Sequence, residues 1–258
     1  MKTFLLIIFS LLALQIAAQK KKARVPSYFG LRVSPIFPTE FIGAKSLSLS
    51  EDSDQAIRMN TTITQKIGYS FGCNVRAGLT KFISLETGIN FNQRSFNVTM
   101  DLPDSSISAS NDISFVSYDV PINALFYIKL AENWFINASL GVAVTFAPSD
   151  IGILTSPKKK HIFRHAGLVD KKVGAELNAN LGFEFRTRKD GIFYIGGSAR
   201  VPFKPLFEFY MQYNYTSSAV QQIIHAPIDG SYISLDFKYF FPNIKNKGVQ
   251  FQDGPIEQ

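Results

Sequence analysis

Histidine and serine are the side chains in this sequence that could carry out catalysis, and they are poorly placed for it. The chain has three histidines, His161, His165 and His225. Ser156 or Ser231 could act as a nucleophile only with a histidine beside it, because a serine hydroxyl needs an adjacent base. No spacing pairs a serine with a histidine. We therefore predict no catalytic residue and no enzyme; an enzyme that modifies membrane lipid is the least favoured alternative.

Metal-ligating residues are equally sparse. His161 and His165 are four residues apart, which places them on one face only in a helix, and no third ligand is evident. The acidic run Glu51-Asp52-Ser53-Asp54 lacks the glycine and the further oxygen ligands of a calcium loop. The single cysteine excludes a disulfide framework and a cysteine-based metal site. The sequence predicts no metal and no cofactor.

Basic residues form one local cluster, predicted to lie in an external loop: Lys158, Lys159, Lys160, Arg164, Lys171 and Lys172. Such a cluster could bind the phosphates of lipopolysaccharide or an acidic partner. The alternative is a solvated loop. The other basic residues are scattered and the net charge is only +7, so we expect no nucleic-acid partner.

The N-terminus has the plan of a secretory signal peptide. Lys2 precedes an apolar stretch from Phe4 to Leu14, and small residues end at Ala18. We expect a signal peptide over residues 1–18, cleaved after Ala18, and a short periplasmic segment over residues 19–26. The protein is therefore expected outside the cytoplasm.

The rest of the chain alternates with period two. From Ile67 to Leu79 every second residue is apolar, and the residues between are small or polar. Such alternation indicates β-strands with one apolar face. Trp134 to Phe146 and Val173 to Phe185 repeat the pattern. Eight strands are predicted, over residues 27–37, 65–80, 82–98, 114–128, 134–147, 173–187, 191–203 and 231–241.

Short and long connections alternate between these strands. The short ones fall near residues 80–81, 129–133 and 188–191, and the long ones are 38–64, 99–113, 148–172 and 204–230. Short periplasmic turns and long external loops are typical of outer-membrane barrels. No run of 18 apolar residues exists that would form a transmembrane helix. We predict a barrel over residues 27–241 and a periplasmic tail over residues 242–258.

The apolar face is predicted to face lipid. A soluble lipocalin-type barrel has its apolar face turned inward. Its outer face should then be rich in lysine and glutamate, whereas the polar face here is rich in glycine, serine and asparagine.

Aromatic residues gather at both strand ends, as in the belts of membrane barrels. The periplasmic belt is predicted to contain Phe82, Phe126, Tyr127, Trp134, Phe183, Phe185, Phe193, Phe237, Tyr239 and Phe241. The external belt is predicted to contain Phe37, Tyr69, Phe71, Phe91, Phe115, Tyr118, Phe146 and Phe203. Cys73 is placed on the lipid face, and Pro121 is expected to mark a bulge.

Charged residues on the opposite face would lie in the lumen. They are Arg32, Arg76, Glu86, Arg94, Asp119, Glu176, Glu184, Arg186, Arg200, Asp236 and Lys238. Six positive and five negative charges in a narrow interior must pair or be hydrated, because an isolated buried charge is costly. We predict an ion-paired plug and negligible conductance. The alternative is a gated ion path or a ligand-binding lumen using Arg76, Arg94, Glu86 and Glu176.

Two segments carry a family resemblance. Ser84 to Phe91 (SLETGINF) and Tyr118 to Tyr127 (YDVPINALFY) resemble strands of the Bacteroidota outer-membrane β-barrel domain proteins, described as PorT-like or porin-family. The architecture is similar to the eight-stranded barrels of OmpA and OmpX. The resemblance implies a fold rather than an activity; PorT itself is linked to type IX secretion.

The fold class is thus predicted to be all-β, an eight-stranded antiparallel up-and-down transmembrane barrel. Its expected role is structural, or that of an accessory subunit. Outer-membrane lipid and lipopolysaccharide are the expected partners, together with other outer-membrane or periplasmic proteins.

Overall fold

The computed structural model describes residues 27–51, 58–80, 82–158, 160–187, 190–215 and 221–242. The predicted signal peptide, the segment over residues 19–26 and nearly all of the tail lie outside them. The described elements are one 3-10 helix, Pro103–Ser105, and these strands: β1 Ser27–Phe37, β2 Ser46–Glu51, β3 Met59–Gly78, β4 Ile83–Leu102, β5 Ile107–Lys129, β6 Trp134–Phe146, β7 Ile151–Lys158, β8 His161–Leu168, β9 Val173–Thr187, β10 Gly191–Pro202, β11 Phe207–Tyr215, β12 Gln221–Ile228 and β13 Tyr232–Phe240.

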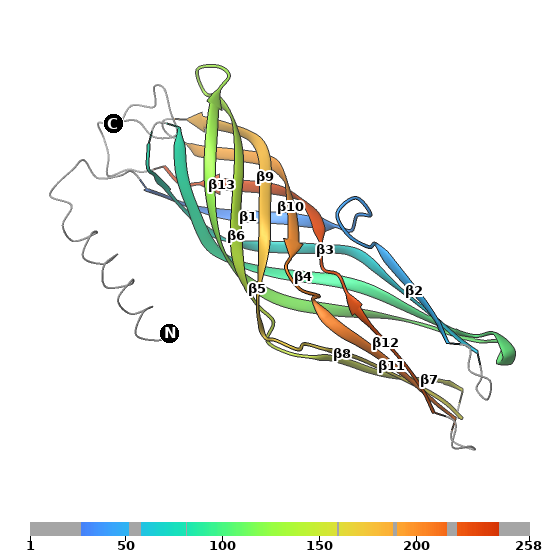
Figure 1. Cartoon of the computed structure of the whole chain (residues 1–258). Helices are drawn as coiled ribbons and strands as arrows, with labels where there is room; N and C mark the ends of the chain where they lie inside the picture. The colour runs from blue at the N-terminus through green and yellow to red at the C-terminus, as the bar shows by residue number, and fades with distance from the viewer. Residues whose placement is uncertain are drawn as a thin grey trace, which may run out of the picture.

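Eight of these strands form a closed antiparallel ring. Their order is β1-β13-β10-β9-β6-β5-β4-β3, and β1 also pairs with β3. The ring contains the eight segments predicted from the alternation, and it confirms an antiparallel all-β barrel. The short turns and both ends of the barrel sequence lie at one end of the ring, which we call the turn end (Figure 1).

The two faces of the barrel wall are oriented as predicted, with apolar residues outside and polar residues inside. In β1, Tyr28, Gly30 and Arg32 are buried, whereas Phe29, Leu31 and Val33 between them are exposed. The exposed side of the ring is therefore a continuous apolar surface, and the polar side faces the lumen. Cys73 is exposed on the apolar surface. No helix among the described residues is long and apolar enough to cross a membrane.

Two residues assigned to the aromatic belts point inward instead. Tyr127 is buried in the lumen, and Phe115 is buried at the external end of β5. Both lie at positions of β5 whose side chains alternate inward with Asp119. These two residues were assigned to the belts because they lie near strand ends. The assignment was wrong because the alternation of β5 turns their side chains inward.

Pro121 does not mark a bulge. The β4–β5 pairing keeps one register from Thr87–Ile122 to Asn90–Asp119, on either side of Pro121. The register shift in this part of the sheet lies in β3, between Lys66 and Tyr69. This shift coincides with the point where β3 leaves the barrel.

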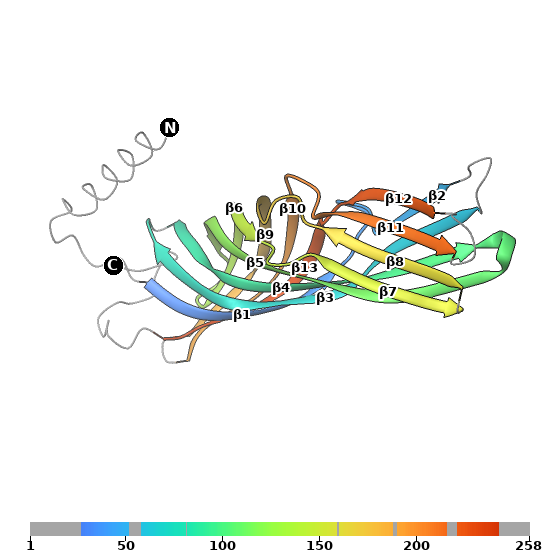
Figure 2. The ribbon, with the colours of Figure 1, turned by 90° about the horizontal axis from the view of Figure 1, so that it is seen from below.

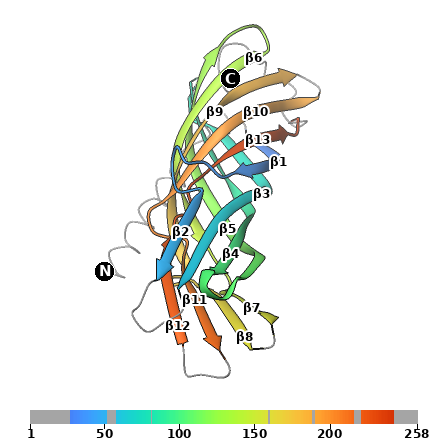
Figure 3. The same ribbon diagram turned by 90° about the vertical axis from the view of Figure 1, so that its right-hand side faces the viewer.

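The long connections contain β-strands, which corrects the prediction that they are loops. β3, β4 and β5 continue well past the barrel, β2 pairs with β3, and residues 99–113 form a hairpin end around the 3-10 helix. A second sheet of order β12-β11-β8-β7 runs alongside them (Figure 2). We call these two layers beyond the barrel the extension; Figure 3 turns that end toward the viewer.

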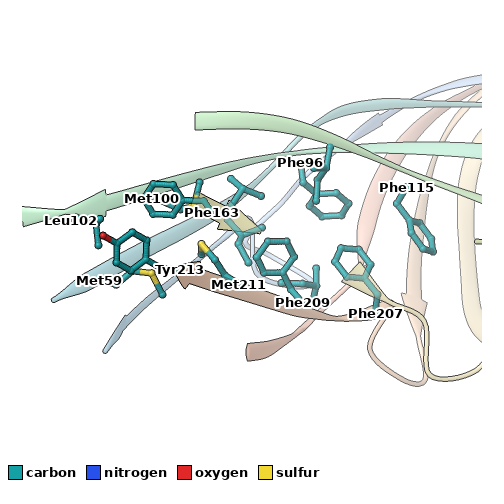
Figure 4. Close-up of a cluster of buried hydrophobic side chains, with 14 of the residues drawn as sticks. Met59, Phe96, Met100, Leu102, Phe115, Phe163, Phe207, Phe209, Met211 and Tyr213 are labelled. Atoms are coloured by element: carbon teal, nitrogen blue, oxygen red, sulfur yellow. The ribbon is translucent and has the colours of Figure 1, made fainter. Parts of the chain in front are cut away.

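The extension has its own hydrophobic core between the two layers (Figure 4). Phe207 from β11 packs edge-on against Phe96 of β4, with ring centroids 5.5 Å apart, and lies 5.4 Å from the ring of Phe115. The remaining core residues include Met59, Ile63, Val98, Met100, Leu102, Ile113, Phe163, Phe209, Met211 and Tyr213. A buried core of this size explains why these segments are ordered sheets, since burial of apolar area offsets the entropy of ordering them.

Candidate functional site

The lumen holds all eleven charged residues singled out from the sequence. Each is at most 8% exposed. They come from β1, β3, β4, β5, β9, β10 and β13 of the ring, and each takes part in at least one ion pair. The side chains reach one another because alternate residues of every strand point to the axis of a narrow ring.

Arg76 bridges the lumen from one wall to the opposite wall. Its Nη2 lies 2.8 Å from Oε2 of Glu86 on the neighbouring strand β4. Its Nη1 lies 2.6 Å from Oε2 of Glu184 on β9, which is four strands away in either direction around the ring. A side chain that contacts both walls occupies the passage between them.

Three further ion pairs also cross the interior. Lys238 Nζ on β13 donates to Glu86 Oε1 on β4 at 2.6 Å. Arg200 on β10 lies 3.2 Å from Asp119 on β5. In the third pair, Arg94 Nη2 on β4 lies 3.7 Å from Glu176 Oε2 on β9. In each pair the strands are three positions apart in the ring.

The remaining pairs are local. Arg32 lies 2.9 Å from Asp236 on the adjacent strand β13, and Arg186 Nε lies 2.6 Å from Glu184 Oε1 on its own strand. Arg200 also donates to Glu176 on β9. The network thus runs along the barrel from Arg186 at the turn end to Arg94 beneath the extension, where Arg94 Nη1 donates to the Gly230 carbonyl at 2.5 Å.

Neutral residues that the sequence analysis did not single out complete the network. Asn90 and Asn92 donate to the two carboxylate oxygens of Asp119 at 2.8 and 2.6 Å. Asn74 donates to Glu86 at 2.8 Å, and Asn180 donates to Asp236 at 3.0 Å. The sequence did contain a signal for these amides, because each lies an even number of positions from a charged lumen residue on its own strand. Hydrogen bonds to charged groups lower the cost of burying them.

Aromatic rings cover several of the cations. The guanidinium of Arg186 lies 3.9 Å from the ring centroid of Phe135, and that of Arg76 lies 4.0 Å from the centroid of Phe240. Arg94 lies 4.5 Å from the centroid of Tyr232. A cation over an aromatic face is attracted by the ring quadrupole. These rings therefore stabilise the charges and also fill lumen volume.

Small residues make room for this filling. Tyr194 of β10 points into the lumen, where its hydroxyl donates to Asn180 Oδ1 at 2.5 Å. A Cβ atom on either Gly182 or Gly196 would overlap the Tyr194 hydroxyl. Gly182 and Gly196 are thus required to leave room for the Tyr194 side chain in the lumen.

A cavity of about 790 Å³ lies where the barrel meets the extension. Arg94 and Glu176 line it from the lumen side. Phe207 lines it from the extension, and Lys172 and Phe203 line it from the connections at its mouth. Its walls therefore combine apolar surface with charges of both signs.

The β7–β8 pairing spreads the basic cluster predicted from the sequence along a hairpin. Lys160 lies at the distal start of β8, Arg164 is in the middle of that strand, and Lys171 and Lys172 follow its other end. Eight strand residues separate the two ends by about 25 Å. Lys158 ends β7, and Lys159 lies outside the described residues. The prediction assumed one compact loop, and the strand pairing separates its members.

The catalytic and metal alternatives are not assembled either. Ser156 donates to the backbone carbonyl of His161, and Ser231 donates to Asp229. His161 Nδ1 lies 2.8 Å from the Tyr213 hydroxyl, and His225 stacks on Tyr210. Within the part of the chain that the structure describes, no three His, Cys, Asp or Glu side chains form a cluster able to hold a metal ion. Asp52, Ser53 and Asp54 of the acidic run lie outside the described residues.

A closed antiparallel ring with an apolar outside and a charged, filled inside defines a membrane β-barrel of the outer-membrane class. The chain belongs to the family described as outer membrane protein beta-barrel domain, whose model matches residues 18–152. Its structure is similar to the crystal structure of the outer membrane protein OprG from Pseudomonas aeruginosa, with a TM-score of 0.50, 13% identity, and coverage of 85% of this chain and 98% of that one. At that identity the likeness shows the fold alone. No curated protein matches the sequence.

Proposed function

We propose that this protein is a non-conducting, eight-stranded transmembrane barrel that holds a folded β extension outside the outer membrane. The observation that carries the proposal is the set of four ion pairs that cross the lumen, from Arg76, Lys238, Arg200 and Arg94. A wide diffusion channel needs about sixteen strands. Eight strands leave an interior that these side chains fill.

The orientation follows the rule for outer-membrane barrels. Short turns face the periplasm and longer segments face outside, so the turn end, which holds the start of β1 and the end of β13, is assigned to the periplasm. A signal peptide cleaved after Ala18 agrees with this direction of export. Two strand motifs, around Glu86 and Pro121, support the narrower assignment to the PorT-like group of the Bacteroidota, which stays a prediction.

The role we assign is structural or accessory rather than enzymatic. The lumen carboxylates are held by cations or amides, and the Ser156 hydroxyl donates to the backbone carbonyl of His161. The extension is a two-layered body with an apolar core, and we infer that its surface presents contacts to lipopolysaccharide or to another envelope protein. Surfaces positioned by a rigid scaffold are common binding sites.

Conductance in planar bilayers tests the plug. We expect the purified wild-type protein to show negligible stable conductance in about 1 M salt, where the high ion concentration gives even a small channel a measurable current and exposed charges are screened within about 3 Å. A double variant, Arg76→Ala with Glu184→Ala, removes one complete cross-lumen pair and should produce measurable channels. The matched control removes the exposed pair Lys66 and Asp112 in the same way and should stay silent. Steady, ion-selective channels from the wild-type protein would overturn the proposal.

Gentle extraction tests the accessory role. We would solubilise native outer membranes in mild detergent, purify the protein and identify what is retained in stoichiometric amount. A retained outer-membrane or periplasmic protein would support an accessory role. A lone, heat-modifiable barrel would contradict it and leave a structural role.

The cavity favours a second candidate function, binding of a small ligand at the junction of barrel and extension. Its volume of about 790 Å³ lies within the range of ligand pockets, and Arg94 and Glu176 supply polar groups at its base. Native mass spectrometry of protein extracted from the outer membrane would show a small molecule retained by the wild type. Ala147→Trp, which fills the cavity, should abolish retention, whereas Val144→Trp on the exposed outer face should preserve it. Equal retention by both variants would remove this candidate.

A further inference from the structure

The extension core contains an unusual group of soft ligands. The chain has four methionines, including the initiator. The other three, Met59, Met100 and Met211, all lie fully buried in this one core, and His165 is buried in it as well. Figure 4 shows the three methionine side chains in the space between the two layers. Their strands come from separate parts of the chain, so only the tertiary structure unites them.

One methionine sulfur contacts the imidazole, and a second methionine lies beside it on the neighbouring strand. Met100 Sδ on β4 is in direct contact with His165 Nε2 on β8, across the gap between the layers. Met211 on β11 is the cross-strand partner of His165. Its sulfur accepts a hydrogen bond from Thr61 Oγ1 at 3.4 Å, and Thr61 is the cross-strand partner of Met100. Met100, Met211 and His165 therefore occupy three corners of one compact square, with Thr61 at the fourth.

The imidazole of His165 is buried in the extension core with few polar contacts. Its Nδ1 has no hydrogen-bond partner among the described residues, and its Nε2 faces only a thioether. A buried polar side chain normally has a full hydrogen-bond partner. A metal ion bound to Nε2 would give this nitrogen the polar partner that the apolar core does not provide.

We propose that Met100, Met211 and His165 form a binding site for a soft monovalent metal ion, Cu(I), with Ag(I) as its redox-inert substitute. Thioether sulfur and neutral imidazole suit Cu(I), whereas magnesium, calcium and manganese require oxygen ligands. The methionine side chain has three rotatable bonds, so Met100 can withdraw from the imidazole to admit an ion between them. The surrounding rings, including Phe209 stacked 6.1 Å from His165, exclude water from the site.

The test is a metal titration of the full-length protein in detergent. Because the exposed Cys73 thiol would also bind Cu(I), all measurements use a Cys73→Ala background. We expect one equivalent of Cu(I), supplied anaerobically with ascorbate and competed with a chromogenic chelator, and one equivalent of Ag(I). X-ray absorption of the Cu(I) form should show sulfur and nitrogen neighbours.

Three variants assign the ligands. Met100→Leu, Met211→Leu and His165→Leu should each weaken Cu(I) binding by at least about tenfold. Mutation of a residue that only orients a metal ligand already has an effect of about this size. Met59→Leu is the matched control, because Met59 lies in the same core with no contact to His165 Nε2, and should leave the affinity unchanged. Methionine and leucine have similar volumes, so the methionine variants should retain the heat-modifiable fold.

Three results would overturn the proposal. They are no Cu(I) or Ag(I) binding in the Cys73→Ala background, equal losses in Met59→Leu and Met211→Leu, and an X-ray absorption spectrum without sulfur neighbours. Any of them would identify the cluster as apolar packing only. None depends on whether the barrel conducts.

Discussion

The guanidinium of Arg76 on β3 lies 2.6 Å from the carboxylate of Glu184 on β9, and these two strands stand on opposite sides of the barrel ring. One ion pair therefore spans the full width of the lumen. Both side chains are at most 1% exposed. A buried pair of this kind contributes little net stability compared with apolar packing, but loss of one partner strands the other charge.

Glu184→Gln should accordingly destabilise the barrel strongly. The change leaves Arg76 and Arg186 with a neutral neighbour, and breaking a buried pair typically costs about 3–5 kcal/mol. The midpoint of urea unfolding, followed by the shift in electrophoretic mobility, measures the effect. Lys66→Gln, which breaks an ion pair at the surface, should cause no measurable change. Similar midpoints for the two variants would show that the lumen charges are hydrated rather than paired.

The depth of the apolar surface predicts a second result. Ile89 is 63% exposed in the middle of β4, opposite Cys73, and Leu79 is exposed beside the turn. An arginine at Ile89 should cost about 2–4 kcal/mol of stability in bilayers, and an arginine at Leu79 about 0–1 kcal/mol, because the penalty falls from midplane to interface. Refolding into lipid vesicles at a series of urea concentrations measures both. Equal costs at the two sites would contradict a bilayer around the ring.

Phe207→Ala should loosen the extension without opening the barrel. Phe207 packs against Phe96 and Phe115, and truncating a buried phenylalanine typically costs about 3–5 kcal/mol. We expect protease cleavage within β7, β8, β11 and β12, while the barrel keeps its heat-modifiable mobility. Phe41→Ala, at a residue that is 87% exposed, is the control. Unfolding of both parts together would show that they are one cooperative unit.

His165 predicts a pH dependence of stability in the metal-free protein. Burial lowers the pKa of His165 in the folded state to about 4, below its ordinary value of 6.5. Between these values the unfolded chain binds the extra proton, so stability is fully present above pH 6.5 and is lost as the pH falls toward 4. At pH 5 the loss should be about 2 kcal/mol.

Urea unfolding of the extension at pH 7.5 and pH 5, followed by protease susceptibility, measures this loss. The difference between wild type and His165→Leu isolates the contribution of His165 from that of other titrating groups. An identical pH dependence in the two proteins would mean that His165 is hydrated or charged in the fold.

The eight barrel strands, their lipid-facing side and the eleven lumen charges could all be read from the sequence. The physical reason is that strand alternation has period two, so each residue of a strand is assigned to one face by its position alone. Arg76, Glu86 and Glu184 alternate with apolar neighbours on their strands and therefore had to share an interior if the ring closed. Tyr127 follows the same alternation. It was wrongly assigned to the periplasmic belt because its closeness to a strand end was given more weight than the alternation.

Which charges pair, and what the long connections become, was decided only by the tertiary structure. The contact between Arg76 and Glu184 depends on ring closure, which makes strands of distant sequence position face one another. The extension core joins Phe96, His165 and Phe207 from three separate segments. Phe207, Phe209, Met211 and Tyr213 alternate with polar residues, so the sequence does carry a strand signal there, but it does not show which strand packs against which. Packing between layers, a long-range interaction, ordered those segments, and no local pattern in the sequence specifies it.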